Sequence, residues 1–163
     1  MDVIDAIRKR RSIRRYERKE IDKEIFDKLL EAARLAPSAK NAQPWKLVVV
    51  TNDSLKKKLV KACSRQTFVG ECSAVIVGVG DPSYKWYIVD TTIALEHIVL
   101  EAVELGLGTC WIGAFNEGEV KKILGIPEDK KVVACLTIGY PAESPPPRPK
   151  KTVEELICFN RYK

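Results

Sequence analysis

The apolar residues of the chain recur at two spacings, and the longer spacing is that of helices. Five stretches carry apolar side chains every three or four residues, which predicts amphipathic or buried helices. Asp2 and Asp22 can cap the first two of them, and Gly106 follows the longest one, which is apolar on most sides and expected to be deeply buried. The predicted helices span about 3–10, 23–36, 55–62, 88–105 and 117–124.

Four further stretches are predicted to be strands, at 46–51, 74–80, 109–113 and 132–140. Residues 74–80 are almost wholly apolar, as is typical of a strand covered on both faces, so this strand is expected to be central. Helices and strands are intermixed along the chain, with no internal repeat and no linker. Residues 1–163 are therefore predicted to form a single domain.

The C-terminal end has a different pattern. A proline-rich run at 145–150 is stiff and extended, with no helix option, and it leads into a tail at 153–163. The apolar residues of this tail are Leu156, Ile157, Phe159 and Tyr162. A small monomer could hardly cover them beyond a proline spacer, so the tail from about 145 is predicted to wrap a second subunit.

Composition indicates a soluble globular protein, with 163 residues of which 45% are hydrophobic and 31% charged. No apolar run approaches the ~20 residues that a helix needs to cross a bilayer. Residues 1–11 are read as a capped helix rather than as a signal peptide. From the sequence, the protein is expected to be cytoplasmic.

Positive charge is concentrated in residues 8–19, called the basic segment below. Eight cations face a single acid there, Glu17, which gives this segment a formal charge of +7 and leaves −1 for the rest of the chain. Such a segment favours an anionic partner. A nucleic-acid backbone, an anionic membrane surface, the phosphate of a small cofactor and a merely solvated face are the possible interpretations. Nucleic-acid binding also calls for aromatic residues among the cations, and only Tyr16 is nearby.

Several chemistries are excluded by the inventory of residues. The five cysteines are widely spaced without a C-x-x-C pair, and His97 is the only histidine, so neither a disulfide framework nor a zinc site is supported. The chain has no G-x-S-x-G elbow and no phosphate-binding G-x-x-x-x-G-K-[ST] loop. Gly78 and Gly80 lack the third glycine of a dinucleotide fingerprint, and no carboxylate pair has the spacing of a glycosidase.

One short motif contains several groups that together can bind a phosphate. The sequence RRSIR at 10–14 lies where the first helix is predicted to stop, and it offers guanidinium groups, a hydroxyl and free backbone N–H groups to one anion. Arginine binds phosphate oxygens in pairs and stays charged near neutral pH. Further motifs follow in order, namely PSAKNAQPW at 37–45, GLGTCWIGAF at 106–115, and GYP at 139–141 before the Pro-Arg-Pro-Lys run. Over nearly the whole chain, this series resembles the FMN-dependent nitroreductase family.

The resemblance implies an α+β fold of three layers, in which helices flank a central mixed β-sheet, and an intertwined homodimer with two FMN molecules at its interface. It further implies that Arg10, Arg11 and Ser12 hold the FMN phosphate and ribityl chain and that Arg14 approaches the pyrimidine edge. Arg148 and Lys150 would close on the phosphate, and Gln66 is a further candidate for the pyrimidine edge. The partner subunit would supply Pro37, Ser38, Ala39 and Asn41. The other side of the ring would be lined by Trp111, Ile112, Gly113 and Ala114.

Two features depart from the family pattern. Ala39 replaces a serine that many members have, which removes one hydroxyl contact. The chain is also too short for the helical insertion that covers the flavin in larger members, so the substrate face is expected to be more open.

The resemblance implies hydride transfer from NADH or NADPH to flavin N5, and from there to a nitroaromatic, quinone or enone in a ping-pong cycle. No acid, base or nucleophile stands out in the sequence, which suits chemistry carried by a cofactor. Arg14 is predicted to act only as an electrostatic tuner, because a cation near the ring favours its reduced, negatively charged state. Alternative tasks within the family are reductive dehalogenation, flavin modification and FMN storage.

Overall fold

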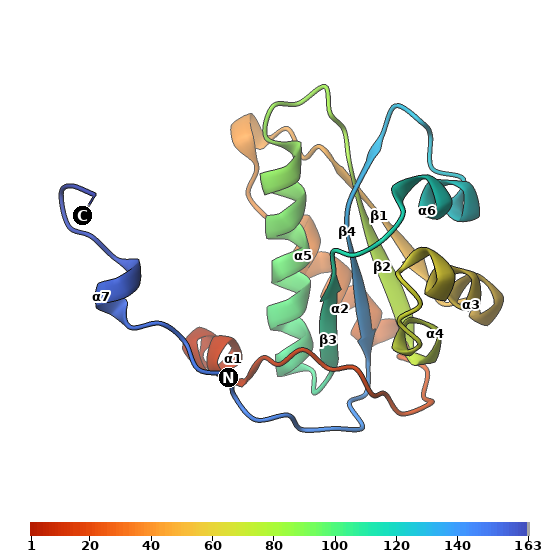
Figure 1. The fold of residues 1–163 in the computed structure, drawn as a ribbon, viewed down its shortest axis with the longest axis horizontal. Coiled ribbons are helices and arrows are strands. Elements are labelled where there is room, and N and C mark those ends of the chain that lie inside the picture. The colour runs from red at the N-terminus through yellow and green to blue at the C-terminus, as the bar shows by residue number, and fades with distance from the viewer. Residues whose placement is uncertain (163) are drawn as a thin grey trace.

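The computed structural model describes residues 1–162 as a four-stranded sheet between two layers of helices (Figure 1). The elements in chain order are α1 (Val3–Lys9), α2 (Lys23–Arg34), the 3-10 helix η1 (Ala39–Asn41), β1 (Trp45–Val50), α3 (Asp53–Ala62), α4 (Phe68–Glu71), β2 (Ala74–Gly80), α5 (Tyr87–Glu104), β3 (Gly108–Ile112), α6 (Glu117–Leu124), β4 (Lys131–Gly139) and α7 (Val153–Leu156). The α+β class and the three layers are confirmed. All five helices and four strands expected from the spacing are present, with ends shifted by one or a few residues.

The sheet has the strand order β1-β2-β4-β3, and each of its three ladders is antiparallel. The expectation of a mixed sheet therefore needs correction for this chain. Within the described residues, the only parallel pairing is an isolated bridge between Ser12 and Thr109 at the outer edge of β3. The prediction that 74–80 is central is confirmed, because β2 pairs with β1 on one side and with β4 on the other.

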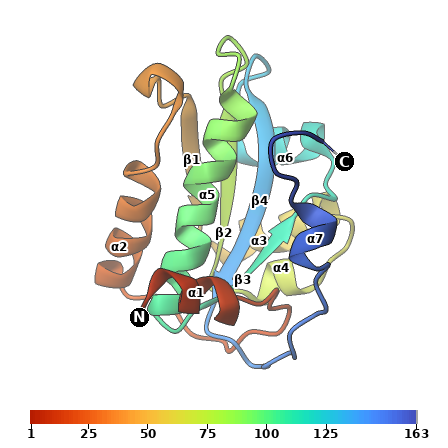
Figure 2. The same ribbon diagram turned by 90° about the vertical axis from the view of Figure 1, so that its left-hand side faces the viewer.

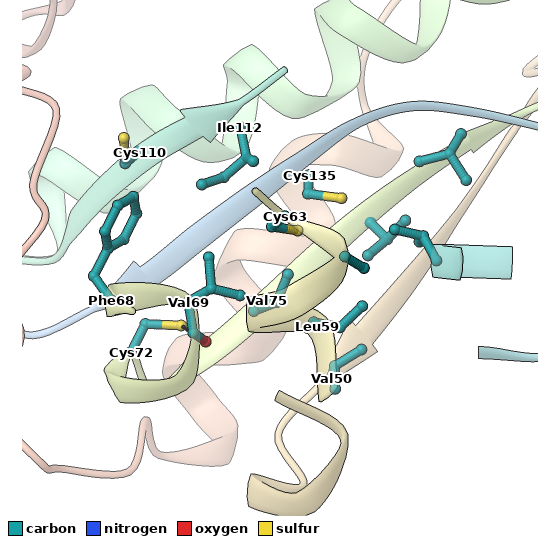
Figure 3. Packing of buried hydrophobic residues seen from close by; sticks show 14 of the residues in the cluster. Val50, Leu59, Cys63, Phe68, Val69, Cys72, Val75, Cys110, Ile112 and Cys135 are labelled. Carbon is teal, nitrogen blue, oxygen red and sulfur yellow. Dashed lines mark hydrogen bonds between the residues drawn. The ribbon is translucent and has the colours of Figure 1, made fainter. Parts of the chain in front are cut away.

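Each face of the sheet has its own apolar core, which explains the continuous apolar run of β2. Val75 and Val77 pack into the cluster under α3, α4 and α6, where Figure 3 shows Cys110 and Ile112 of β3 as well. Ile76 belongs to the opposite cluster, under α2 and α5. Figure 2 shows α2, α5 and α1 in front of the sheet. Alternate residues of one strand thus serve two cores.

The long helix α5 is only partly buried, contrary to its apolar sequence. Residues in its middle turns, such as Leu95 and Ile98, are fully buried. At its N-terminal end, however, Trp86, Ile88 and Val89 are 50%, 53% and 49% exposed. Neighbouring apolar side chains of this size are unusual on a solvent-facing helix, so this end has the character of an interaction surface.

The C-terminal arm, residues 145–162, leaves the body of the chain and extends past α1 (Figure 1). Its short helix α7 is capped locally, because Thr152 and Glu155 exchange side-chain-to-backbone hydrogen bonds. The apolar residues of the arm point into solvent, with Phe159 81% and Tyr162 99% exposed. The predicted tail ends at Lys163, which lies outside the described residues. No helix within 1–162 is long and apolar enough to cross a membrane.

Candidate functional site

The basic segment lies along the free edge of β3. The Ile13 N–H donates a hydrogen bond of 2.9 Å to the carbonyl oxygen of Thr109, and Ser12 forms its parallel bridge with the same residue. Ile13 is buried, and a Cβ added at Gly108 would come within 2.6 Å of its Cγ1 atom. Only glycine permits so close an approach. The backbone on either side of Ile13 is thereby held beside β3, which ends in the W-I-G motif at 111–113.

Tyr16 anchors the other end of this contact. Its hydroxyl donates to the carbonyl of Ile13 at 2.7 Å and lies 2.8 Å from the hydroxyl of Thr137 on β4. The backbone around it pairs with the chain that follows β4, through a bridge to Pro141. A buried tyrosine with both bonding partners satisfied makes this segment part of the scaffold rather than a loose loop.

Burial raises the pKa of Tyr16 well above its ordinary value of about 10, although the hydrogen bond to Thr137 lowers it. The folded state thus keeps a proton that the unfolded chain loses above about pH 10, and stability should fall there by about 1.4 kcal/mol per pH unit. We expect Tyr16→Phe to be less stable than wild type at neutral pH by about 1–3 kcal/mol, because partners are left unsatisfied. Above pH 10 this gap should shrink, as measured by urea unfolding between pH 8 and 11.

Tyr84→Phe provides the matched control for loss of an exposed tyrosine hydroxyl. A gap between wild type and Tyr16→Phe that stays constant across this pH range would show that the hydroxyl does not stay protonated in the folded protein.

The cations of the basic segment differ in their burial and in their contacts. Arg10 ends α1 and is half-buried, whereas Arg14 is exposed. Burial raises the pKa of the neighbouring Cys110 thiol, and the charges of Arg14 and Arg10 and a hydrogen bond with Ser12 act against that rise. Arg10, Ser12 and Arg14 thus all lie near enough to Cys110 of β3 to act on its thiol. Arg11 instead donates to the carbonyls of Arg8 and Arg10, both at 2.7 Å, and so caps α1.

The expectation of free backbone N–H groups in this segment is wrong at two positions. The N–H of Ile13 is taken by Thr109, and the N–H of Arg14 donates to the carboxylate of Glu143 at 2.6 Å. Both acceptors come from distant parts of the sequence. An anion bound here must therefore rely on side chains more than on these two backbone groups.

The W-I-G motif ends β3 at the edge of this cluster. Ile112 points into the core, as Figure 3 shows, so only its backbone is available to a ligand. The Trp111 indole donates to Glu96 of α5 at 3.2 Å, which fixes it against that helix. Gly113 and Ala114 are exposed, and a Cβ at Gly113 would meet nothing within 4 Å. The end of β3 thus offers open backbone rather than a wall of side chains.

Gln66 lies in a turn that reaches the same open end. Ser64 and Arg65 adopt left-handed backbone conformations, with φ of 55° and 59°, and the Ser64 hydroxyl donates to the Ala114 carbonyl at 3.0 Å. The Gln66 amide donates to the Cys63 carbonyl at 3.1 Å. The turn is near the predicted ring site, while the amide of Gln66 is already bonded within its own turn.

The predicted loop at 37–41 lies elsewhere. The Ala39 N–H donates to both carboxylate oxygens of the buried Asp90, at 3.3 Å each, in the first turn of α5. The N-terminal amine of Met1, from the helix that leads into the basic segment, pairs instead with Glu104 in the last turn of α5. The two ends are about 20 Å apart along the helix axis, and Figure 1 shows η1 and the basic segment at opposite ends of α5. One chain therefore does not bring both sets of residues together.

This loop is held in a strained shape. Lys40, Asn41 and Gln43 have positive φ values of 54°, 54° and 51°, a conformation that costs free energy for residues other than glycine. The Gln43 N–H donates to the Ser38 hydroxyl at 2.9 Å, and the Gln43 amide bonds to Asn41. Such strain is typical of ligand-binding segments. Of the two remaining loop residues, Pro37 is exposed and Ala39 half-buried.

Arg148 and Lys150 lie on the exposed C-terminal arm. Among the described residues neither forms an ion pair. Sequence reasoning also missed three residues that shape the site, namely Tyr16, Asp90 and Glu143. Only Asp90 carried a signal, as a carboxylate within an apolar helix; the other two act through contacts over more than 100 positions.

The sequence and the fold of this chain are both similar to those of one protein family. The family model described as "Nitroreductase family" matches residues 7–82 and, in an overlapping match, 65–140. A protein of Methanothermobacter thermautotrophicus, provisionally named NADH dehydrogenase/NAD(P)H nitroreductase, is 35% identical over 154 residues, which cover 89% of this chain and 80% of that protein.

Two solved structures are similar over nearly the whole chain. A nitroreductase family protein from Clostridium novyi has a TM-score of 0.84 and 38% identity, covering 88% of this chain and 87% of that one. An FMN-dependent nitroreductase from Clostridium difficile has a TM-score of 0.85 and 31% identity, covering 98% and 99%. Sequence motifs, family model and fold agree, and the chain therefore belongs to the nitroreductase family.

Proposed function

We propose that the protein is an FMN-dependent NAD(P)H oxidoreductase that passes hydride to an electron-poor acceptor. The observation that carries this proposal is the pairing of the basic segment with β3, which gathers Arg10, Ser12 and Arg14 beside an open strand end. Family membership and the names of the similar proteins, which include an FMN-dependent nitroreductase and an NAD(P)H nitroreductase, support the cofactor and the reductant.

The residues present fit FMN by the chemistry of their donors. The guanidinium group of Arg10 and the hydroxyl of Ser12 match a phosphate monoester and the start of a ribityl chain, and the guanidinium group of Arg14 suits an electron-rich edge of the ring. The exposed backbone at Gly113 and Ala114 leaves room for a flat ring, because no side chain lies within 4 Å of a Cβ at Gly113. When bound, FMN would supply the redox chemistry, taking hydride at N5 from NADH or NADPH and giving it to a nitroaromatic, quinone or enone.

The protein's own residues bind and orient the cofactor in this scheme. Arg10 and Ser12 hold the phosphate and ribityl chain, and Arg14 places a positive charge at the pyrimidine edge, where it favours the reduced ring. Backbone groups of Gly113 and Ala114 face the ring.

A second copy of the chain completes the site in this proposal. The loop 37–41 contacts one end of α5 and the basic segment lies near the other end, about 20 Å away along the helix axis, so the loop would reach the cofactor of the partner. The exposed apolar side chains of α5 and of the C-terminal arm support a homodimer, because pairing would bury them. The arm would then bring Arg148 and Lys150 to the phosphate.

The test is reduction of the bound cofactor under anaerobic conditions. Purified protein loaded with FMN should lose its absorbance near 450 nm when NADH or NADPH is added, at about 1 equivalent per FMN. Addition of a nitroaromatic, quinone or enone should restore it. FMN that binds and is not reduced by either nucleotide would contradict the proposal and favour storage. Reoxidation only by a halogenated aromatic would indicate reductive dehalogenation.

A further inference from the structure

A carboxylate lies within the cation cluster of the site. Glu143 follows β4 and is half-buried, and its Oε1 atom accepts the Arg14 N–H at 2.6 Å. Among the residues that the structure describes, its carboxylate has no cationic side chain within 4.0 Å. Its negative charge is therefore not neutralised by a direct ion pair, although its side chain contacts the backbone of the basic segment.

The negative charge of Glu143 acts on two buried residues near β3, Tyr16 and Cys110. Burial is the main cause of the raised pKa of both Tyr16 and Cys110, and the charge of Glu143 adds to the rise in each case. For Cys110 it acts against the charges of Arg14 and Arg10. The same point of β3 is thus exposed to two cations and one anion.

The hydrogen bond made by Glu143 does not require its charge. The chain after β4 pairs with the basic segment through backbone bonds, from Glu17 to Tyr140 and from Ala142 to Arg15. The side chain of Glu143 adds one more hydrogen bond to this pairing, because it accepts the N–H of Arg14. A glutamine could accept the same hydrogen bond without a charge. The effect of the charge can therefore be separated from the effect of the bond.

We propose that Glu143 opposes Arg14 and holds down the reduction potential of the bound flavin. This inference rests on the proposed function, since it needs FMN at the cation cluster. A carboxylate there repels the negative charge that the ring gains on reduction and also repels the phosphate, whereas Arg14 attracts both. The balance between the two residues then sets the potential and the affinity.

Glu143→Gln separates charge from hydrogen bonding. We expect the midpoint potential of bound FMN, measured by anaerobic dye titration, to become more positive than in wild type. The dissociation constant for FMN should fall by up to about tenfold, as one charge acting across a partly screened site allows. The difference in affinity should shrink as salt is raised from about 50 to 500 mM, because screening weakens a charge effect. Arg14→Ala should shift the potential in the opposite direction.

Two variants control for other causes. Glu20→Gln removes an equal charge directly after the basic segment. Glu20 lines a cavity of about 800 Å³ together with residues of α3, so this variant should leave the potential unchanged. Glu143→Ala loses both charge and bond; its potential should rise as in Glu143→Gln, while its FMN binding is weakened by the looser Arg14 backbone.

The outcomes separate this inference from the proposed function. Wild-type protein that binds no FMN would mean that the proposed function has failed. If wild type binds FMN while Glu143→Gln leaves its potential unchanged or makes it more negative, the function stands and the role given to Glu143 is wrong. A rise in potential only in Glu143→Ala would make Glu143 a residue that positions the backbone alone.

Discussion

Replacing Arg10 by alanine is expected to weaken FMN binding by about one to two orders of magnitude, since a hydrogen bond to a charged group is worth about 1.5–3 kcal/mol. Arg10 ends α1, is half-buried and acts on Cys110 together with Arg14 and Ser12. Its loss removes one guanidinium from the phosphate cluster without opening the core. Fluorescence titration of FMN into the apoprotein measures the change.

Arg18→Ala is the matched control for this variant. It removes the same charge from the basic segment, but the charge of Arg18 acts on Asp53 at the start of α3, away from β3. FMN affinity should therefore stay close to that of wild type. Equal weakening by both variants would show that the segment attracts FMN only through its overall charge and that Arg10 makes no specific contact.

Mixing two defective variants is expected to restore part of the FMN binding, because each site takes residues from two copies of the chain. Arg10→Ala damages the basic segment and Asn41→Ala damages the loop at the other end of α5, so a homodimer of either variant should have two defective FMN sites. In a mixed dimer, one site combines both intact segments and the other combines both damaged ones. Random mixing should thus restore about one site in four to wild-type affinity. Flavin bound per chain after co-expression, at FMN concentrations that leave each variant empty, measures the recovery.

A second mixture tests whether recovery needs segments from different copies. Arg10→Ala mixed with Ser12→Ala leaves a damaged basic segment in every site, and no site should recover. Recovery in this control, or its absence in the first mixture, would contradict the assignment of 37–41 to the partner's cofactor.

Local patterns in the sequence predicted most of the fold. The apolar run at 74–80 indicated a central strand, and β2 is indeed covered on both faces by separate cores. The burial of α5 was overestimated, because Trp86, Ile88 and Val89 are apolar and yet exposed in one chain. Periodicity shows that a face is apolar; it does not show whether the same chain covers it.

The contacts that build the candidate site were harder to predict. The motif RRSIR predicts an anion site, and in the structure Arg10, Ser12 and Arg14 all act on the thiol of Cys110. Its backbone N–H groups were expected to be free, yet Thr109 and Glu143 accept two of them. These partners lie 96 and 129 positions away, so no local pattern reveals them.

The sheet illustrates the same limit. A mixed sheet was expected from the resemblance, but the three ladders are antiparallel, and parallel pairing within the described residues is confined to the bridge between Ser12 and Thr109. Strand direction follows from how the connections cross, and the alternation of apolar residues carries no information about it.

The central claim is that two copies of this chain hold FMN between them, and sedimentation of the purified protein tests it most directly. Detection at both protein and flavin absorbance, after FMN is added, should show one boundary at twice the chain mass of 18.3 kDa. It should carry about one FMN per chain. A boundary at the mass of a single chain, with no flavin absorbance moving with it, would contradict the claim.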